Sequence, residues 1–206
     1  MLRTLLILTL SIASCGSGVR QEQKLDSRAT PSPLLAVDYS WKSAMFREIN
    51  ERVRVAGIKG LEDARLSGSD LEVRIWHGFG LILIEGLVIK RVEGKWSALH
   101  LAGVSSTPPK HNRQTITGVP KSGWEICWQR LTNAGMLSLP DATRLGKEPV
   151  DPDVLSYVVE LNIGGDYRTY HYTYPEANEH NEAKRMIEIG DIISEEFGLP
   201  QFRTQR

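Results

Sequence analysis

The sequence predicts an α+β domain, with one antiparallel sheet of about five strands and helices packed mainly on one face of it. Two observations predict this class. Strand-like segments come in two runs joined by short glycine turns, and such hairpins require antiparallel pairing. Helix-like segments stand before, between and after these runs, instead of alternating with single strands. We therefore expect a single domain over residues 34–206.

Composition and charge exclude several classes of protein. The chain has 206 residues, of which 41% are hydrophobic and 24% charged, so collagen-like, coiled-coil and wholly disordered chains are excluded. It holds 25 basic and 25 acidic side chains, so its formal net charge is zero. Binding to nucleic acid needs a basic surface that neutralises phosphates, and we expect no nucleic-acid partner.

The first helix is predicted over residues 40–55. Its apolar side chains recur every three or four residues, which is the period of one helix face: Trp41, Ala44, Met45, Ile49 and Val53. Ser40 is a candidate N-cap, and Gly57 follows the last apolar position and ends the helix.

The first run of strands covers residues 71–102. Apolar and polar residues alternate over 71–76, as in a half-buried strand. Trp76 falls on the opposite face from Val73 and Ile75. We expect a helix to cover that face too; the alternative is an exposed aromatic patch for recognition.

Glycines punctuate the rest of this run. Residues 77–80 are interpreted as a turn, and the continuous apolar runs between 81 and 89 predict a central strand with a bulge at Gly86. A tight turn at residues 93–94 then leads into a strand over 96–101.

A loop and a second helix follow. Residues 103–121 are loop-like. Ser122 and Glu125 have the spacing of a capping box and predict a helix that ends near Gly135. Cys127 falls on the apolar face of this helix, where a lone cysteine is more often a core residue than a nucleophile.

Residues 155–174 give the clearest hairpin signal. The turn lies at 164–165 or at 165–166, and both registers place Tyr170, Tyr172 and Tyr174 over the face of residues 157–161. A last helix follows, which ends at Gly198. Its predicted apolar stripe is Ala183, Met186, Ile187, Ile193 and Phe197, and Ile189 and Ile192 widen it.

The N-terminus has the layout of a secretory signal. Arg3 precedes an apolar run over residues 5–12, and small residues follow. The run is too short for a membrane-spanning helix, which needs about 20 apolar residues. Ile12, Ala13 and Ser14 stand directly before Cys15. This sequence resembles the lipobox of bacterial lipoproteins.

The resemblance implies a lipid anchor. Cys15 would carry a diacylglycerol thioether and further acylation, residues 1–14 would be removed as the signal peptide, and residues 15–33 would be the lipidated cysteine and a polar tether. Gly16 after the cysteine implies the outer membrane, facing the periplasm. The alternative is an ordinary cleaved signal that contains a cysteine.

One pair of residues could carry acid–base chemistry. The turn at 93–94 places His100 opposite Leu87, beside Glu85, so an acid and a base could be neighbours on the sheet. His77 is a further candidate. The alternative is that these are ordinary polar residues of a sheet.

Known motifs for cofactors and metals are missing from the sequence. It has no phosphate-binding glycine loop and no nucleophile elbow, and His171 and His180 do not have the spacing of a helical zinc site. We interpret Glu176, Glu179 and Glu182 as solvated acids at a helix start. We expect no cofactor and no metal.

The chain resembles small bacterial lipoproteins with a short tether and one α+β domain. We expect a non-enzymatic envelope lipoprotein that binds a protein or another envelope component, and contacts the membrane through the lipid on Cys15. The alternative is a hydrolase-like enzyme that uses His100 with Glu85, or His77. A catalytic pair should line a pocket within hydrogen-bond reach, whereas a binding module should show a flat apolar patch.

Overall fold

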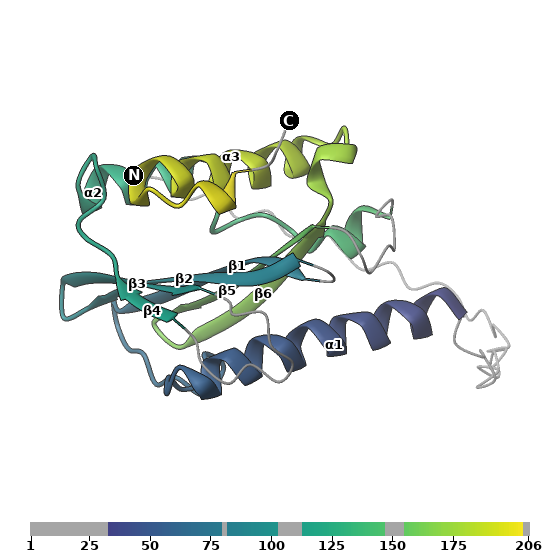
Figure 1. The fold of residues 1–206 in the computed structure, drawn as a ribbon, viewed down its shortest axis with the longest axis horizontal. Helices are drawn as coiled ribbons and strands as arrows, with labels where there is room; N and C mark the ends of the chain where they lie inside the picture. The colour runs from purple at the N-terminus through teal and green to yellow at the C-terminus, as the bar shows by residue number, and fades with distance from the viewer. Residues whose placement is uncertain (1–32, 80–81, 103–112, 147–154, 204–206) are drawn as a thin grey trace, which may run out of the picture. The chain divides into compact units, whose positions relative to one another are not determined.

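The computed structural model describes residues 33–79, 82–102, 113–146 and 155–203. These residues belong to one compact unit that begins at Pro33, whereas the predicted signal, Cys15 and nearly all of the tether lie outside the described residues. The fold is α+β, as predicted (Figure 1).

One antiparallel sheet of six strands, in the order β4-β3-β2-β1-β5-β6, forms the middle layer. The strands are β1 (Leu71–Phe79), β2 (Ile82–Val92), β3 (Lys95–Ala102), β4 (Arg113–Ile116), β5 (Ser156–Ile163) and β6 (Asp166–Thr173). The helices are α1 (Pro33–Val55), α2 (Trp124–Asn133) and α3 (Asn181–Phe197). Short 3-10 turns form η1 (Ala142–Leu145), η2 (Pro175–Ala177) and η3 (Pro200–Phe202).

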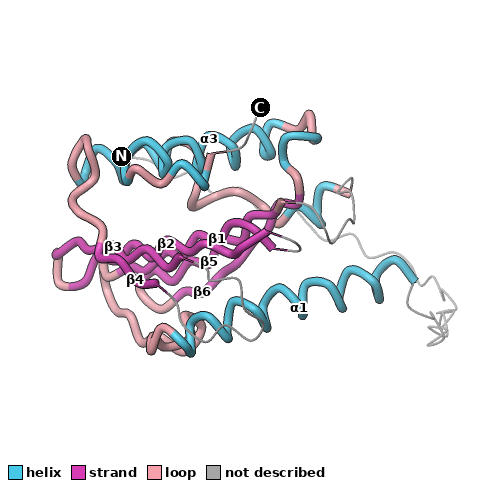
Figure 2. The backbone as a smooth tube through the Cα atoms, viewed as in Figure 1, coloured by secondary structure: helices cyan, strands magenta, loops and turns pink. Residues whose placement is uncertain are grey.

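Helices cover both faces of the sheet. Helices α2 and α3 lie on one face and α1 lies on the other (Figures 1 and 2). Trp76 of β1 is fully buried in the cluster that contains Met45, Ile49 and Val53 of α1. The expectation that a helix covers the face of Trp76 is therefore confirmed.

Three strand predictions need correction. β1 does not turn at residues 77–80 but continues through His77 to Phe79, and its register against β2 shifts only between His77 and Phe79. At this irregularity Gly78 and Phe79 have positive φ values of 118° and 84°. Glycine adopts such values readily and is common in turns, which explains why the sequence here resembles a turn. Strand β4 lies inside the segment predicted as loop, because four mostly polar residues at a sheet edge give no alternation.

Gly86 does not mark a bulge. It pairs in register with Trp76. A Cβ at position 86 would lie 2.4 Å from Cζ3 of the Trp76 indole, so glycine makes room for this ring against the sheet.

We expect Gly86→Ala to lower the free energy of unfolding by about 1–3 kcal/mol, because the added methyl group overpacks the Trp76 ring. Gly118→Ala is the matched control: no atom lies within 4 Å of a Cβ there, and the change should stay within about 0.5 kcal/mol. Urea unfolding curves of both variants measure the difference. Equal midpoints would contradict this account of Gly86.

Helix α1 is longer than predicted, and α2 begins without a capping box. α1 starts at Pro33 and not at Ser40, since proline fits the first position of a helix. The N-cap of α2 is Gly123. Ser122 instead donates from its backbone nitrogen and its hydroxyl to Glu196 of α3, at 2.9 Å each, and so ties α2 to α3.

The hairpin of β5 and β6 and the last helix agree with the sequence in outline. Ile163 pairs with Asp166, which selects the turn at 164–165. Helix α3 ends at Gly198, which has a φ of 67°. Ile189 and Ile192, predicted to widen the stripe, are buried, whereas Ile187 and Phe197, predicted within it, are only half-buried.

Candidate functional site

A cavity of about 490 Å³ lies at the end of the sheet where β1 and β2 meet. Its walls come from these two strands, from the segment that enters β5, and from the 3-10 turns before and after α3. The lining residues are His77, Leu83, Glu85, Leu155, Tyr174, Glu176, Pro200, Gln201 and Arg203.

Strand register brings the polar side chains of this site together. His77 of β1 pairs directly with Glu85 of β2 and, on its other side, with Tyr157 of β5. Side chains alternate along a strand, so His77 points to the same face as Val73 and Ile75, which is the face covered by α2 and α3. The sequence prediction that placed His77 in a turn is thus wrong.

The predicted pair of His100 and Glu85 is confirmed as a contact. The turn at 93–94 sets the register in which His100 pairs with Leu87, and Nε2 of His100 lies 2.6 Å from Oε2 of Glu85. Both side chains are largely buried. Glu85 lines the cavity, and His100 supports it from β3.

Gln201 of η3 completes this group. Its amide nitrogen lies 3.0 Å from Nε2 of His100 and 3.4 Å from Oε2 of Glu85. An imidazole nitrogen either donates or accepts. In either role Nε2 is occupied by its protein neighbours Glu85 and Gln201.

His77 is the most buried polar side chain of the site. It is 4% exposed, and its ring lies 4.4 Å from the Tyr157 ring and 5.6 Å from the Phe202 ring, measured between centroids. Burial lowers the pKa of His77 to about 4, so the ring is neutral at pH 7. Its Nε2 is buried and has no hydrogen-bond partner among the described residues, although the residue lines a cavity.

The turn η3, which carries the lining residue Gln201 and forms the roof of the cavity, lies close to β5 and α3. The Tyr157 hydroxyl donates to the carbonyl oxygen of Phe202 at 2.8 Å and holds η3 on the sheet. A Cβ on Gly190 of α3 would lie 2.5 Å from that same oxygen and 3.0 Å from the Tyr157 hydroxyl. The absence of a side chain at position 190 therefore allows η3 to pack against α3 and β5.

Glu176 is a site residue that sequence reasoning missed. It was interpreted as a solvated acid at a helix start, but it stands on η2, before α3, and lines the cavity. Its Oε2 is buried without a hydrogen-bond partner in the part of the chain that the structure describes, and burial raises the pKa of the Glu176 carboxyl group. Tyr174 precedes it with a φ of 45° and an exposed ring. Tyr174 and Glu176 line the same cavity as His77 because of the path that the chain takes after β6, and the sequence does not predict this path.

The other sequence candidates lie outside the cavity lining. His171 contacts Asp141, with 3.2 Å between Nδ1 and Oδ2, and His180 is the N-cap of α3. Cys127 is a buried thiol in the core, where burial raises its pKa to about 12. In the described part of the chain, no group of three or more His, Cys, Asp or Glu side chains is arranged to hold a metal ion.

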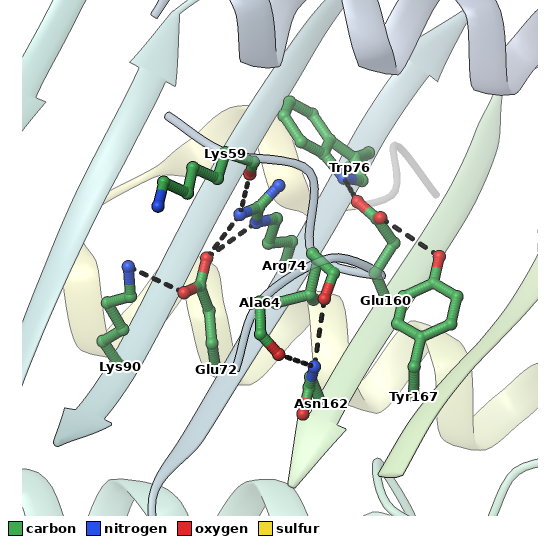
Figure 3. Close-up of polar contacts among 10 residues, drawn as sticks. Lys59, Ala64, Glu72, Arg74, Trp76, Lys90, Glu160, Asn162 and Tyr167 are labelled. Atoms are coloured by element: carbon green, nitrogen blue, oxygen red, sulfur yellow. Dashed lines mark hydrogen bonds and ion pairs between the residues drawn. The ribbon is translucent and has the colours of Figure 1, made fainter. Parts of the chain in front are cut away.

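A second polar cluster lies on the opposite face of the sheet, under α1 and the segment 56–70 (Figure 3). Arg74 donates to Glu72 at 2.8 Å and to the Lys59 carbonyl at 2.7 Å, and Lys90 contacts Glu72 at 2.7 Å. Most of these polar groups have hydrogen-bond or ion-pair partners within the protein. We therefore assign the cluster a structural role, which is to hold the segment 56–70 on the sheet.

Glu160 belongs to the same cluster. The Trp76 indole donates to it at 2.7 Å and the Tyr167 hydroxyl at 3.3 Å (Figure 3). Burial raises the pKa of Glu160 despite these two donors.

Comparison with known proteins gives no family for this chain: no family model matches it, and a search of curated proteins returns no match. Within the described residues, no helix has the length and apolar character needed to cross a membrane.

The buried His77 predicts a specific pH dependence of stability. Its pKa is about 4 in the folded protein against 6.5 ordinarily, so the unfolded chain takes up the proton first as the pH falls. The stabilising effect is therefore present above pH 6.5 and is lost as the pH falls toward 4. It amounts to about 3 kcal/mol at most.

His77→Gln cannot titrate in this range, so its free energy of unfolding should fall less steeply than that of the wild type between pH 6.5 and 4. Urea unfolding at several pH values measures both slopes. Glu160 and Glu176, whose pKa values are raised, act in the opposite direction in both proteins and cancel in the comparison. Parallel curves would contradict the buried neutral state of His77.

Proposed function

We propose that the protein is a lipid-anchored lipoprotein of the bacterial envelope, attached to the outer membrane facing the periplasm, and that its domain binds a ligand in the cavity at His77. One observation carries the binding part: His77 lines the cavity, and its buried Nε2 has no partner among the residues that the structure describes. An unpaired buried polar group costs about 1–3 kcal/mol. A ligand that pairs with it recovers this cost.

The anchor rests on the lipobox-like residues Ile12, Ala13 and Ser14 before Cys15. The compact unit begins at Pro33, so a stretch of polar residues separates Cys15 from the domain. Several acyl chains hold a protein on a membrane far more firmly than one chain.

Two features favour binding over catalysis. His100 is not among the residues that line the cavity, and its Nε2 is occupied by Glu85 and Gln201. The described lining residues include no serine, threonine or cysteine that could act as a nucleophile. A cavity, in place of the flat apolar patch expected of a protein-binding module, favours a small ligand or a single side chain of an envelope protein.

Cys15→Ala should abolish acylation, because the modified sulfur is lost. Labelling with radioactive palmitate and membrane fractionation measure the effect, and Cys127→Ala, which removes the other cysteine, should keep the label and the membrane location. A Cys15→Ala protein that is still labelled, trimmed and membrane-bound would overturn the anchor.

A hydrolase is the second candidate function, favoured by the 2.6 Å contact between His100 and Glu85 beside the cavity. General acid–base catalysis contributes about 10²–10⁴-fold to a rate. If the pair is catalytic, Glu85→Gln and His100→Asn should each lower the hydrolysis of p-nitrophenyl esters by about that factor. Hydrolysis that is absent in the wild type, or equal in both variants, would dismiss this candidate.

A further inference from the structure

The charges on the cavity wall are unevenly paired. Glu85 has His100 as a neighbour, and Arg203, the cation of the lining, is largely exposed with its Nε 3.3 Å from Asp191. Glu176 forms no ion pair with any described residue, and one of its carboxylate oxygens is buried without a hydrogen-bond donor. The wall therefore holds a carboxylate without an ion-pair partner among the described residues.

His77, which lines the same cavity, supplies a second, independent unpaired atom. The side chain is 4% exposed and its Nε2 has no partner in the described protein. In the neutral ring, Nε2 accepts a hydrogen bond when the proton lies on Nδ1. A ligand group that donates several hydrogen bonds and carries a positive charge could satisfy both His77 and Glu176.

A protonated primary amine has these properties. It carries one positive charge and three N–H donors. A carboxylate or phosphate would meet Glu85 and Glu176 with like charge, and a hydroxyl would leave the charge of Glu176 unpaired. The remaining wall is suited to a short hydrocarbon stem, since it includes Leu83 and Leu155 and the ring of Tyr174.

We propose that the cavity binds a primary alkylammonium group, with Glu176 as its ion-pair partner and Nε2 of His77 as a hydrogen-bond acceptor. This inference rests on the proposed ligand-binding function and names its chemistry. The amine can belong to a free small molecule or to a lysine side chain of a partner protein, because both present the same group on a four- or five-atom stem.

The experiment is isothermal titration calorimetry of the full chain in detergent with three probes of equal length: n-pentylamine, 1-pentanol and pentanoate. Pentylamine should bind about tenfold or more tightly than either other probe, since hydrogen bonds to charged groups are worth about 1.5–3 kcal/mol, and 1.4 kcal/mol is tenfold. N-acetyl-lysine methylamide is the fourth probe. If it binds better than pentylamine, the source is a lysine side chain; if worse, a free amine.

Two variants and one control test the assigned contacts. Glu176→Gln should weaken pentylamine binding about tenfold or more and leave 1-pentanol unchanged. Glu179→Gln removes the same charge from an exposed residue outside the lining and should change binding less than about twofold. His77→Phe keeps a ring of similar size and should weaken pentylamine binding, with circular dichroism confirming that the variant is folded.

The outcomes separate this inference from the proposed function. If 1-pentanol or pentanoate binds as tightly as pentylamine and His77→Phe weakens it, ligand binding at the cavity stands and the ammonium inference is overturned. If Glu176→Gln and Glu179→Gln weaken pentylamine equally, the ion pair is overturned. If no probe binds, both the inference and the cavity-binding function are overturned, and the lipid anchor is judged by the palmitate experiment alone.

Discussion

Strand β1 imposes the constraint on which the rest of the structure depends. It is buried over its whole length from Leu71 to Phe79, and yet it carries ionisable side chains on both faces. Each buried polar group needs a partner, since leaving it unpaired costs free energy. On the face of α1, Glu72 and Arg74 find partners in each other and in neighbouring segments. On the face of α3, His77 keeps an open Nε2 beside a cavity.

The two clusters differ in what they do for the protein. In the network of Glu72, Arg74 and Lys90 each charged group has an ion-pair partner, and Arg74 also donates to the Lys59 carbonyl, so the network orders a segment without regular structure over the sheet. Among the described residues only Nη1 of Arg74 lacks a partner in this network. A buried ion pair adds little net stability but makes alternative packings costly. The cavity group is closed only in part: Glu85, His100 and Gln201 satisfy one another, while Glu176 and His77 do not.

Local sequence patterns predicted the features that nearby residues determine, such as hairpin turns, strand register and the face on which a side chain lies. The turn at 93–94 fixes the register of β2 and β3, and this register alone was enough to bring His100 to Glu85. The alternation over 71–76 predicted correctly that Trp76 faces away from Val73. The sequence did not predict that β1 extends through His77, because Gly78 and the residues around it resemble a turn. The strand there is held by pairing with β5, which lies far away in the sequence.

The remaining site residues depend on contacts between distant segments. Glu176 lies in an acidic segment of the kind that often precedes a helix. It lines the cavity only because β6 ends at that edge of the sheet. The roof at Gln201 depends on Tyr157, Phe202 and Gly190, which meet from β5, η3 and α3. No spacing in the sequence links these three residues. Ile187 shows the same limit on a smaller scale: the helical period places both Ile187 and Ile189 on the apolar side of α3, and only the packing of α3 buries Ile189 and leaves Ile187 half-buried.

The glycine at position 190 has a consequence for how the chain can vary. Any side chain there displaces the carbonyl of residue 202, whatever residue supplies that carbonyl, and with it the short turn that carries Gln201. Glycine at position 190 is therefore expected to be retained in related chains that keep a tyrosine at position 157 and this short turn, whatever residue stands at position 202. Selection for the cavity acts in part on a residue that is not among those lining it.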